Sequence, residues 1–187
     1  MNESVAPDPL LRVQEFVNSY ELDTGRDELT DEGLRAWMLR HSLAGGDEGI
    51  ADSDVGRAMA VREALRGLLA VNNGAPPRQA DLDVLNAAAA ACPLEVRFDP
   101  DGAELTPRSR GLDAALGRLL LGAFEAMADG SWDRLKVCAD DTCRWAFLDQ
   151  SRNRSGHWCA MRSCGNRAKA RRFRARRGTA TNPAAGD

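Results

Sequence analysis

The first forty residues contain two stretches in which apolar side chains recur at helical spacing. One stripe comprises Leu10, Val13, Val17 and Tyr20. The other comprises Leu34, Trp37, Met38 and His41, and Thr30 precedes it as a candidate N-cap. A repeat of three to four residues places such side chains on one face of a helix. The pattern therefore predicts two helices that bury these faces in a core, with His41 as a structural residue.

Three more helices and one hairpin are predicted before residue 130. After a glycine-rich loop at 45–49, one helix should begin at a Ser53 cap and end at Asn72-Asn73-Gly74, and an alanine-rich helix should follow Pro76-Pro77. Residues 94–98 alternate between apolar and polar side chains, and turn formers at 99–102 separate them from a partner strand at 103–106. Regularly spaced apolar residues from 112 to 127 indicate a long amphipathic helix.

The remaining chain reads as a small, separate unit. Alternation at 144–149 predicts a strand, 150–156 is a polar loop, and no helix breaker occurs between Gly165 and Gly178. We expect Trp145, Phe147 and Trp158 to form the core of this unit, and Phe173 to pack inward from the last helix. The predicted fold class is α+β and predominantly helical: an N-terminal helical domain with a small antiparallel hairpin, then a β-hairpin followed by a basic helix.

Charge separates the chain at about the same place. The 187 residues carry a formal charge of −3, but residues 131–187 hold 13 Lys and Arg against 5 Asp and Glu, and residues 1–130 hold 12 against 23. A strongly basic unit suits a polyanionic partner. We therefore divide the chain into an acidic N-terminal domain at 1–130, to which the family resemblance given below assigns a regulatory or ligand-sensing role, a basic module at 131–177 and a disordered tail at 178–187.

Four cysteines in the basic module have the spacing of a metal site. Cys138 and Cys143 form one C-x4-C pair, Cys159 and Cys164 form another, and 15 residues separate the pairs. Two such pairs can enclose one Zn²⁺, and four thiolates leave no position for a reactive water, so the zinc should be structural. An iron–sulfur cluster, disulfides, or His157 in place of one thiolate are the alternatives.

The sequence shows no export segment, membrane span or catalytic residue set, and these absences set our expectations for compartment and catalysis. The N-terminus shows neither a basic start nor an apolar export segment, and no stretch approaches the length that crosses a bilayer. We expect a cytoplasmic protein with reduced thiols, in which the isolated Cys92 acts as a small buried hydrophobe. No convergent Ser, His, Asp or Cys set is evident, so we expect no enzyme and assign no catalytic residues.

Several short motifs at fixed spacing resemble a known family. They are Cys138-Ala139, Cys143-Arg144-Trp145-Ala146-Phe147-Leu148-Asp149, Ser151-Arg152-Asn153, Trp158-Cys159 and Cys164-Gly165-Asn166-Arg167-Ala168-Lys169. This stretch, residues 134–177, resembles the CGNR zinc finger of bacterial proteins. The preceding region, with Phe16-Val17-Asn18 and Val61-Arg62-Glu63-Ala64-Leu65-Arg66, is similar to the ABATE domain of stress-induced transcription regulators. The resemblance implies a zinc-dependent DNA-binding regulator with Cys138, Cys143, Cys159 and Cys164 as ligands.

The basic helix supplies the candidate contacts to nucleic acid. A helix fixed by zinc at its N-terminal end can enter a major groove, where Asn and Arg read base edges and other cations hold phosphates. The candidates are Asn166, Arg167, Lys169, Arg171, Arg172, Arg174, Arg176 and Arg177, with Arg152 and Arg154 in the loop. A structural role is an equal alternative for Asn166. RNA binding and a redox-responsive protein-interaction adaptor are the alternative functions, and a small-molecule effector and a homodimer are possible partners.

Overall fold

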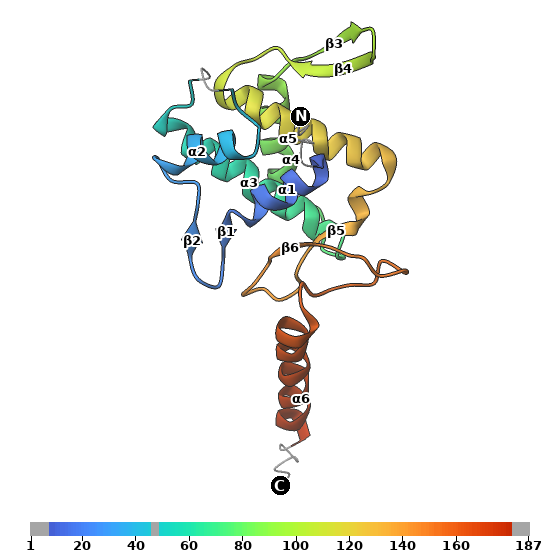
Figure 1. The fold of residues 1–187 in the computed structure, drawn as a ribbon. Coiled ribbons are helices and arrows are strands. Elements are labelled where there is room, and N and C mark those ends of the chain that lie inside the picture. Colours follow the sequence, from blue (N-terminus) through green and yellow to red (C-terminus); the bar gives the residue numbers. More distant parts are fainter. Residues whose placement is uncertain (1–7, 46–48, 181–187) are drawn as a thin grey trace, which may run out of the picture.

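Five helices pack into one body that contains the main hydrophobic core. The computed structural model describes residues 8–45 and 49–180, with side chains as far as Ala175, so residues 46–48 of the predicted loop lie outside it. The helices are α1 (Pro9–Asn18), α2 (Gly33–Arg40), α3 (Val55–Val71), α4 (Gln79–Ala91) and α5 (Gly111–Asp129). Their apolar stripes meet in the body, as the helical spacing predicts (Figure 1). None of the described helices is both long and apolar enough to cross a membrane.

The helix ends agree with the sequence only in part. α1 ends at Asn18, so Tyr20 of the predicted stripe lies outside it, and α2 ends before His41. Thr30 Oγ1 accepts a hydrogen bond from the backbone N–H of Gly33 at 3.0 Å, the contact expected of a cap near the start of α2. Ser53 is not the cap of α3, because a 3-10 turn at Asp52–Asp54 precedes that helix and Asp54 accepts from the backbone N–H of Ala51. α5 ends at Gly130 with a left-handed φ of 77°, a conformation that glycine adopts at low cost.

The predicted hairpin forms but stands away from the body. β3 (Leu94–Asp99) pairs antiparallel with β4 (Gly102–Pro107), and Val96 lies opposite Leu105. Figure 1 shows this hairpin at the top of the molecule, above α5. A second, shorter ladder joins β1 (Tyr20–Glu21) and β2 (Arg26–Asp27).

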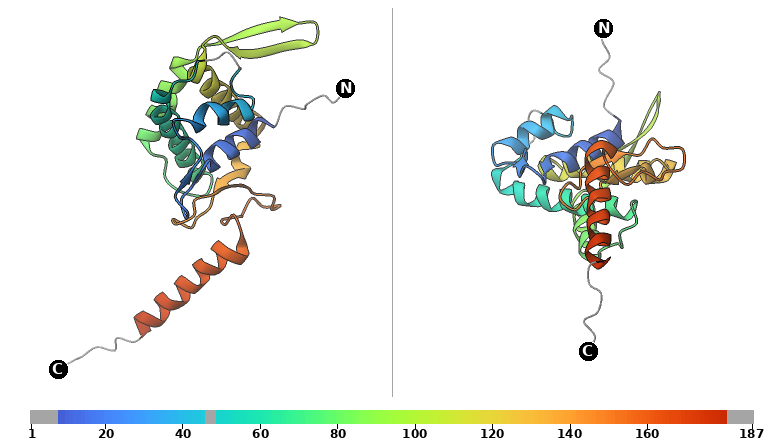
Figure 2. Two further views of the ribbon diagram at one scale, coloured as in Figure 1. Left: turned by 60° about the vertical axis from the view of Figure 1, so that its left-hand side comes forward. Right: turned by 90° about the horizontal axis from the view of Figure 1, so that it is seen from below.

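The cysteine-rich region closes the other end of the body. A 3-10 turn at Trp132–Arg134 leads into β5 (Leu135–Val137), which pairs with β6 (Ala146–Leu148). A π-turn at Met161–Gly165 then joins α6 (Asn166–Ala180), which runs on through Gly178. α6 projects away from the rest of the molecule (Figure 1 and the left view of Figure 2). The remainder of the predicted tail, residues 181–187, lies outside the described residues.

The β5–β6 hairpin belongs to the core of the helical body. Leu135, Val137 and Ala146 are buried in the same cluster as the helix stripes. The prediction that Trp145, Phe147 and Trp158 form a separate core is wrong in this respect, because all three are half-buried. The buried residue of β6 is Ala146, which lies on the opposite face, because the helical body covers that face.

Candidate metal centre and basic helix

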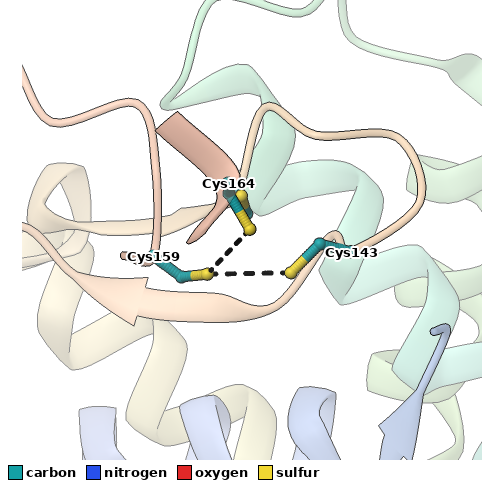
Figure 3. A group of neighbouring side chains, drawn as sticks. Cys143, Cys159 and Cys164 are labelled. Carbon is teal, nitrogen blue, oxygen red and sulfur yellow. Dashed lines mark hydrogen bonds between the residues drawn. The ribbon is translucent and has the colours of Figure 1, made fainter. Parts of the chain in front are cut away.

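The four cysteines predicted to bind zinc lie together. Cys138 follows β5, Cys143 lies in the next turn, and Cys159 and Cys164 flank the start of the π-turn that leads to α6. The four sulfurs lie within 4.8 Å of one another. Figure 3 shows three of them converging, with Sγ distances of 3.6 Å from Cys143 to Cys159 and 3.7 Å from Cys159 to Cys164.

These distances fit one tetrahedral zinc ion. Zn–S bonds of about 2.3 Å place the sulfurs of a tetrahedron about 3.8 Å apart. A disulfide would require about 2.05 Å, and all five cysteines of the chain are free. His157 is not part of the cluster, because its Nδ1 lies 2.5 Å from Asn73 Oδ1. The four thiols can therefore hold one Zn²⁺, whose chemistry here would be structural because no coordination position is left open.

Burial favours the neutral form of two of the four thiols. Burial raises the pKa of Cys143 to about 11 and raises that of Cys159 further. Burial opposes a charge on Cys164 too, but hydrogen bonds from neighbouring thiols outweigh it and lower that pKa. Metal binding requires thiolates, so zinc uptake at this site must release protons.

A buried ion pair shapes the loop between the two cysteine pairs. Lys136 Nζ on β5 lies 2.9 Å from Asp149 Oδ2, and both side chains are almost fully buried. Lys136 also donates to the carbonyls of Arg154 and Gly156, and Asp149 accepts from the backbone N–H of Gly156 at 2.7 Å. A side chain at Gly156 would collide with the Asp149 carboxylate. We call Lys136, Asp149 and Gly156, with the contacts among them, the latch. The sequence analysis did not predict it, although the spacing Asp149-x-Ser151 is that of an Asx turn.

The latch also fixes the protonation of its carboxylate. Burial alone would raise the pKa of Asp149, but hydrogen bonds from Lys136, Ser151 and Gly156 outweigh burial and hold the pKa well below its usual range. Asp149 is therefore charged at neutral pH, and it forms its ion pair with Lys136 inside the fold.

Asp140 connects the first cysteine turn to the start of α6. Its carboxylate accepts from Arg167 Nε at 2.9 Å and lies 3.3 Å from Arg171 Nη2. Burial opposes its charge, but hydrogen bonds from Arg167 and Thr142, with the Arg171 charge, lower its pKa to about 2. Arg167 also lies 3.0 Å from the sulfur of Cys164. Two of the predicted nucleic-acid contacts thus position the helix against the metal centre.

Of the other predicted nucleic-acid contacts, some side chains bond to groups within the protein and others are exposed cations. Asn166 donates to the carbonyl of Arg162, as in its structural alternative, Arg154 pairs with Asp133, and Arg174 donates to the carbonyl of Ala170. Lys169, Arg172 and Arg152 are exposed and pair with no carboxylate among the described residues. Phe173 is 61% exposed and does not pack inward, whereas Ala168 does. The side chains of Arg176 and Arg177 lie outside the described residues.

Exposed Arg162 is a further cation that sequence analysis missed. It lies in the π-turn immediately before α6. The sequence could have indicated this exposed cation through its position between Cys159 and Cys164, because the short turn that brings both ligands to one ion directs side chains between them outward.

Hydrogen bonds from the helical body hold the cysteine-rich region. Asn18 on α1 donates to the carbonyl of Ala146 and accepts from its N–H. Asn72 donates to the carbonyls of Trp132 and Leu135. Asn73 at the end of α3 donates to the carbonyl of Val137, immediately before the first cysteine. The centre is therefore built on the body rather than suspended from a linker.

A closed four-thiolate centre at the base of a basic helix defines a zinc-finger protein. Residues 134–177 match the CGNR zinc finger. Residues 12–130, more than half of the chain, match ABATE, described as "Putative stress-induced transcription regulator", and the chain belongs to this family. Neither family is one of enzymes. No curated protein matches the chain.

Proposed function

We propose that this protein is a zinc-dependent transcription regulator whose helix α6 binds duplex DNA. The N-terminal domain would sense a ligand or mediate assembly, and the protein would work in the reducing cytoplasm. The observation that carries the proposal is a basic helix that projects from the body while its first turn is anchored at the cysteine cluster. An anchored, projecting helix can enter a major groove about 12 Å wide without moving the body.

The ion pairs of α6 suggest different roles for its cations. Arg167 and Arg171 set the angle of the helix through Asp140. Lys169 and Arg172 lie three residues apart on another face, exposed and available to phosphates. The geometry favours DNA over RNA, because the major groove of duplex RNA is too narrow and deep for side chains to read.

The test is a salt titration of labelled random duplex with the zinc-loaded protein. Removing two phosphate contacts with Lys169→Ala and Arg172→Ala should reduce the slope of log affinity against log salt by about 1.8 and leave zinc content unchanged. Arg97→Ala with Arg108→Ala is the matched control, because it removes two exposed cations in and just after the β3–β4 hairpin, far from α6 (Figure 1). The proposal is wrong if both double variants bind like wild type, or if tighter binding to single-stranded RNA survives competition with duplex DNA.

A further inference from the structure

The β3–β4 hairpin carries an apolar face that the helical body leaves uncovered. Leu94, Val96 and Phe98 of β3 share this face, and Leu105 lies directly opposite Val96 on β4. Phe98, next to the turn, is 83% exposed. The opposite face is charged, and Glu95 pairs with Arg97 there. We call Phe98 the knob.

A groove lies beside the base of the same hairpin. It has a volume of about 490 Å³ and is bordered by Leu94 and Leu105 of the hairpin and by Leu120, Leu121 and Phe124 of α5. These residues are apolar, and none of the described residues that line the groove is charged. Its floor depends on Gly117, where any side chain would collide with the sulfur of buried Cys92. We call this depression the groove.

The exposed apolar area is large enough for an interface between two chains. Six residues of the hairpin and α5 are 38–83% exposed: Leu94, Val96, Phe98, Leu105, Phe124 and Met127. At about 150–250 Å² for each fully exposed side chain, they leave roughly 500–800 Å² uncovered. A standard interface buries about 800 Å² on each partner, and the largest patch of a typical monomer is about 300–600 Å².

A second copy of this chain is the partner that this surface fits. The knob and the groove occur on one molecule, so a two-fold axis lets each copy insert its knob into the other's groove and closes the assembly. The patch itself is uncharged, which suits contact between two domains that each carry excess acid. An isolated two-stranded hairpin is also marginally stable in water, and a partner would cover it.

We propose that the protein forms a two-fold dimer in which Phe98 of each copy enters the groove formed by α5 and the hairpin base of the other. The inference rests on the part of the proposed function that assigns assembly to the N-terminal domain. It places the dimer contacts at the end of the body opposite to α6, so that each copy keeps its basic helix exposed (Figure 1).

Sedimentation of the zinc-loaded full chain without DNA tests the inference. Wild type should sediment as twice the 20.3 kDa chain mass at micromolar concentration. Phe98→Glu should weaken dimerisation about 100-fold or more, because each copy loses a central aromatic anchor. Arg97→Gln, the neighbouring position on the charged face, lowers the hairpin charge by the same amount and should remain dimeric.

A mixing experiment separates lost contact from misfolding. Phe124→Lys should also be monomeric, because it places a charge in the groove. When it is mixed with Phe98→Glu, one intact knob meets one intact groove and the new charges attract at the other site, so a mixed dimer should form. Failure of the mixture to dimerise would overturn the reciprocal arrangement.

Three other results would overturn the dimer itself. They are a wild-type monomer at about 100 μM, a Phe98→Glu dimer as tight as wild type, and a monomer whose groove binds an apolar fluorescent dye. The last result would make the groove a small-molecule site. Because Phe98→Glu leaves α6 unchanged, its monomer should keep the wild-type salt slope on short random duplex, so the DNA-binding proposal is tested independently.

Discussion

Replacing Arg66 by Met should unfold the junction between the helical body and the metal centre. Arg66 on α3 is fully buried, and Nη2 donates to the carbonyls of Val17 at 2.6 Å and Tyr20 at 3.2 Å. Nη1 donates to the carbonyl of Arg144 at 2.9 Å, and Nε pairs with Glu63 at 3.0 Å. Burial lowers the pKa of Arg66, but guanidinium groups remain charged in proteins. One side chain thus joins α1, the β1 strand and the residue after the second cysteine.

The expected loss follows from the groups left without partners. Met keeps an unbranched apolar stem but is shorter than Arg and donates no hydrogen bond, so three carbonyls lose a charged donor. Each unsatisfied buried group costs about 1–3 kcal/mol, and relief from burying the guanidinium offsets part of that sum. We expect a net loss of about 3–5 kcal/mol. This is a large part of the roughly 5–15 kcal/mol that stabilises a typical domain.

Urea unfolding of the zinc-loaded protein, followed by tryptophan fluorescence, measures this loss. Trp37 reports on the helical body, and Trp145 and Trp158 report on the cysteine-rich region. Arg57→Met is the control, because Arg57 is half-exposed and its ion pairs on the surface are worth about 0–1 kcal/mol. Zinc release to a chelating dye should accompany unfolding, since Arg66 holds the residue next to Cys143.

Two results would refute this reasoning about Arg66. If Arg66→Met unfolds within about 0.5 kcal/mol of wild type, the buried hydrogen bonds contribute little. If the variant loses its body structure while zinc release stays at the wild-type urea concentration, the body and the metal centre are separate folding units.

Two further predictions concern the metal centre and its latch. Cys159→Ser should lower zinc from one ion per chain to well below one, as measured by elemental analysis, whereas Cys92→Ala should keep one ion because Cys92 lies outside the cluster. Equal zinc in both variants would contradict the ligand assignment. The pKa of Asp149 is lower in the folded protein than its ordinary value of 3.8, so the ionised carboxylate stabilises the fold at pH values above 3.8. This stability is lost as the pH falls from about 5 through the folded pKa. The unfolding free energy of wild type should therefore fall more steeply between pH 5 and 3 than that of Asp149→Asn, and parallel pH profiles would exclude this role.

The shared core gives a physical route between the two ends of the molecule. α5 borders the groove at one end, and the 3-10 turn that follows it leads directly into β5 and the first cysteine. A change in packing along α5 would therefore reach the metal centre through Trp132 and Leu135, which are both buried. The groove end of the body and the metal centre are thus joined by packed structure.

The sequence determined the features that depend on local spacing. Helical stripes, the turn formers at 99–102 and the glycine at 130 predicted helices, a hairpin and a helix end that the structure contains. The four ligand positions were also readable, because zinc accepts few ligand types and cysteine pairs at short spacing can reach one ion with little chain between them.

The tertiary structure decided which of these elements touch. Arg66 reads in the sequence as a charge on a helix, yet it is the buried centre of the junction, because carbonyls from three distant segments converge on it. Likewise, Arg167 and Lys169 look alike in a basic run, but only folding places Asp140 beside the first of them. Local spacing encodes the conformation of short segments, whereas a partner 27 or 78 residues away is fixed by packing of the whole chain.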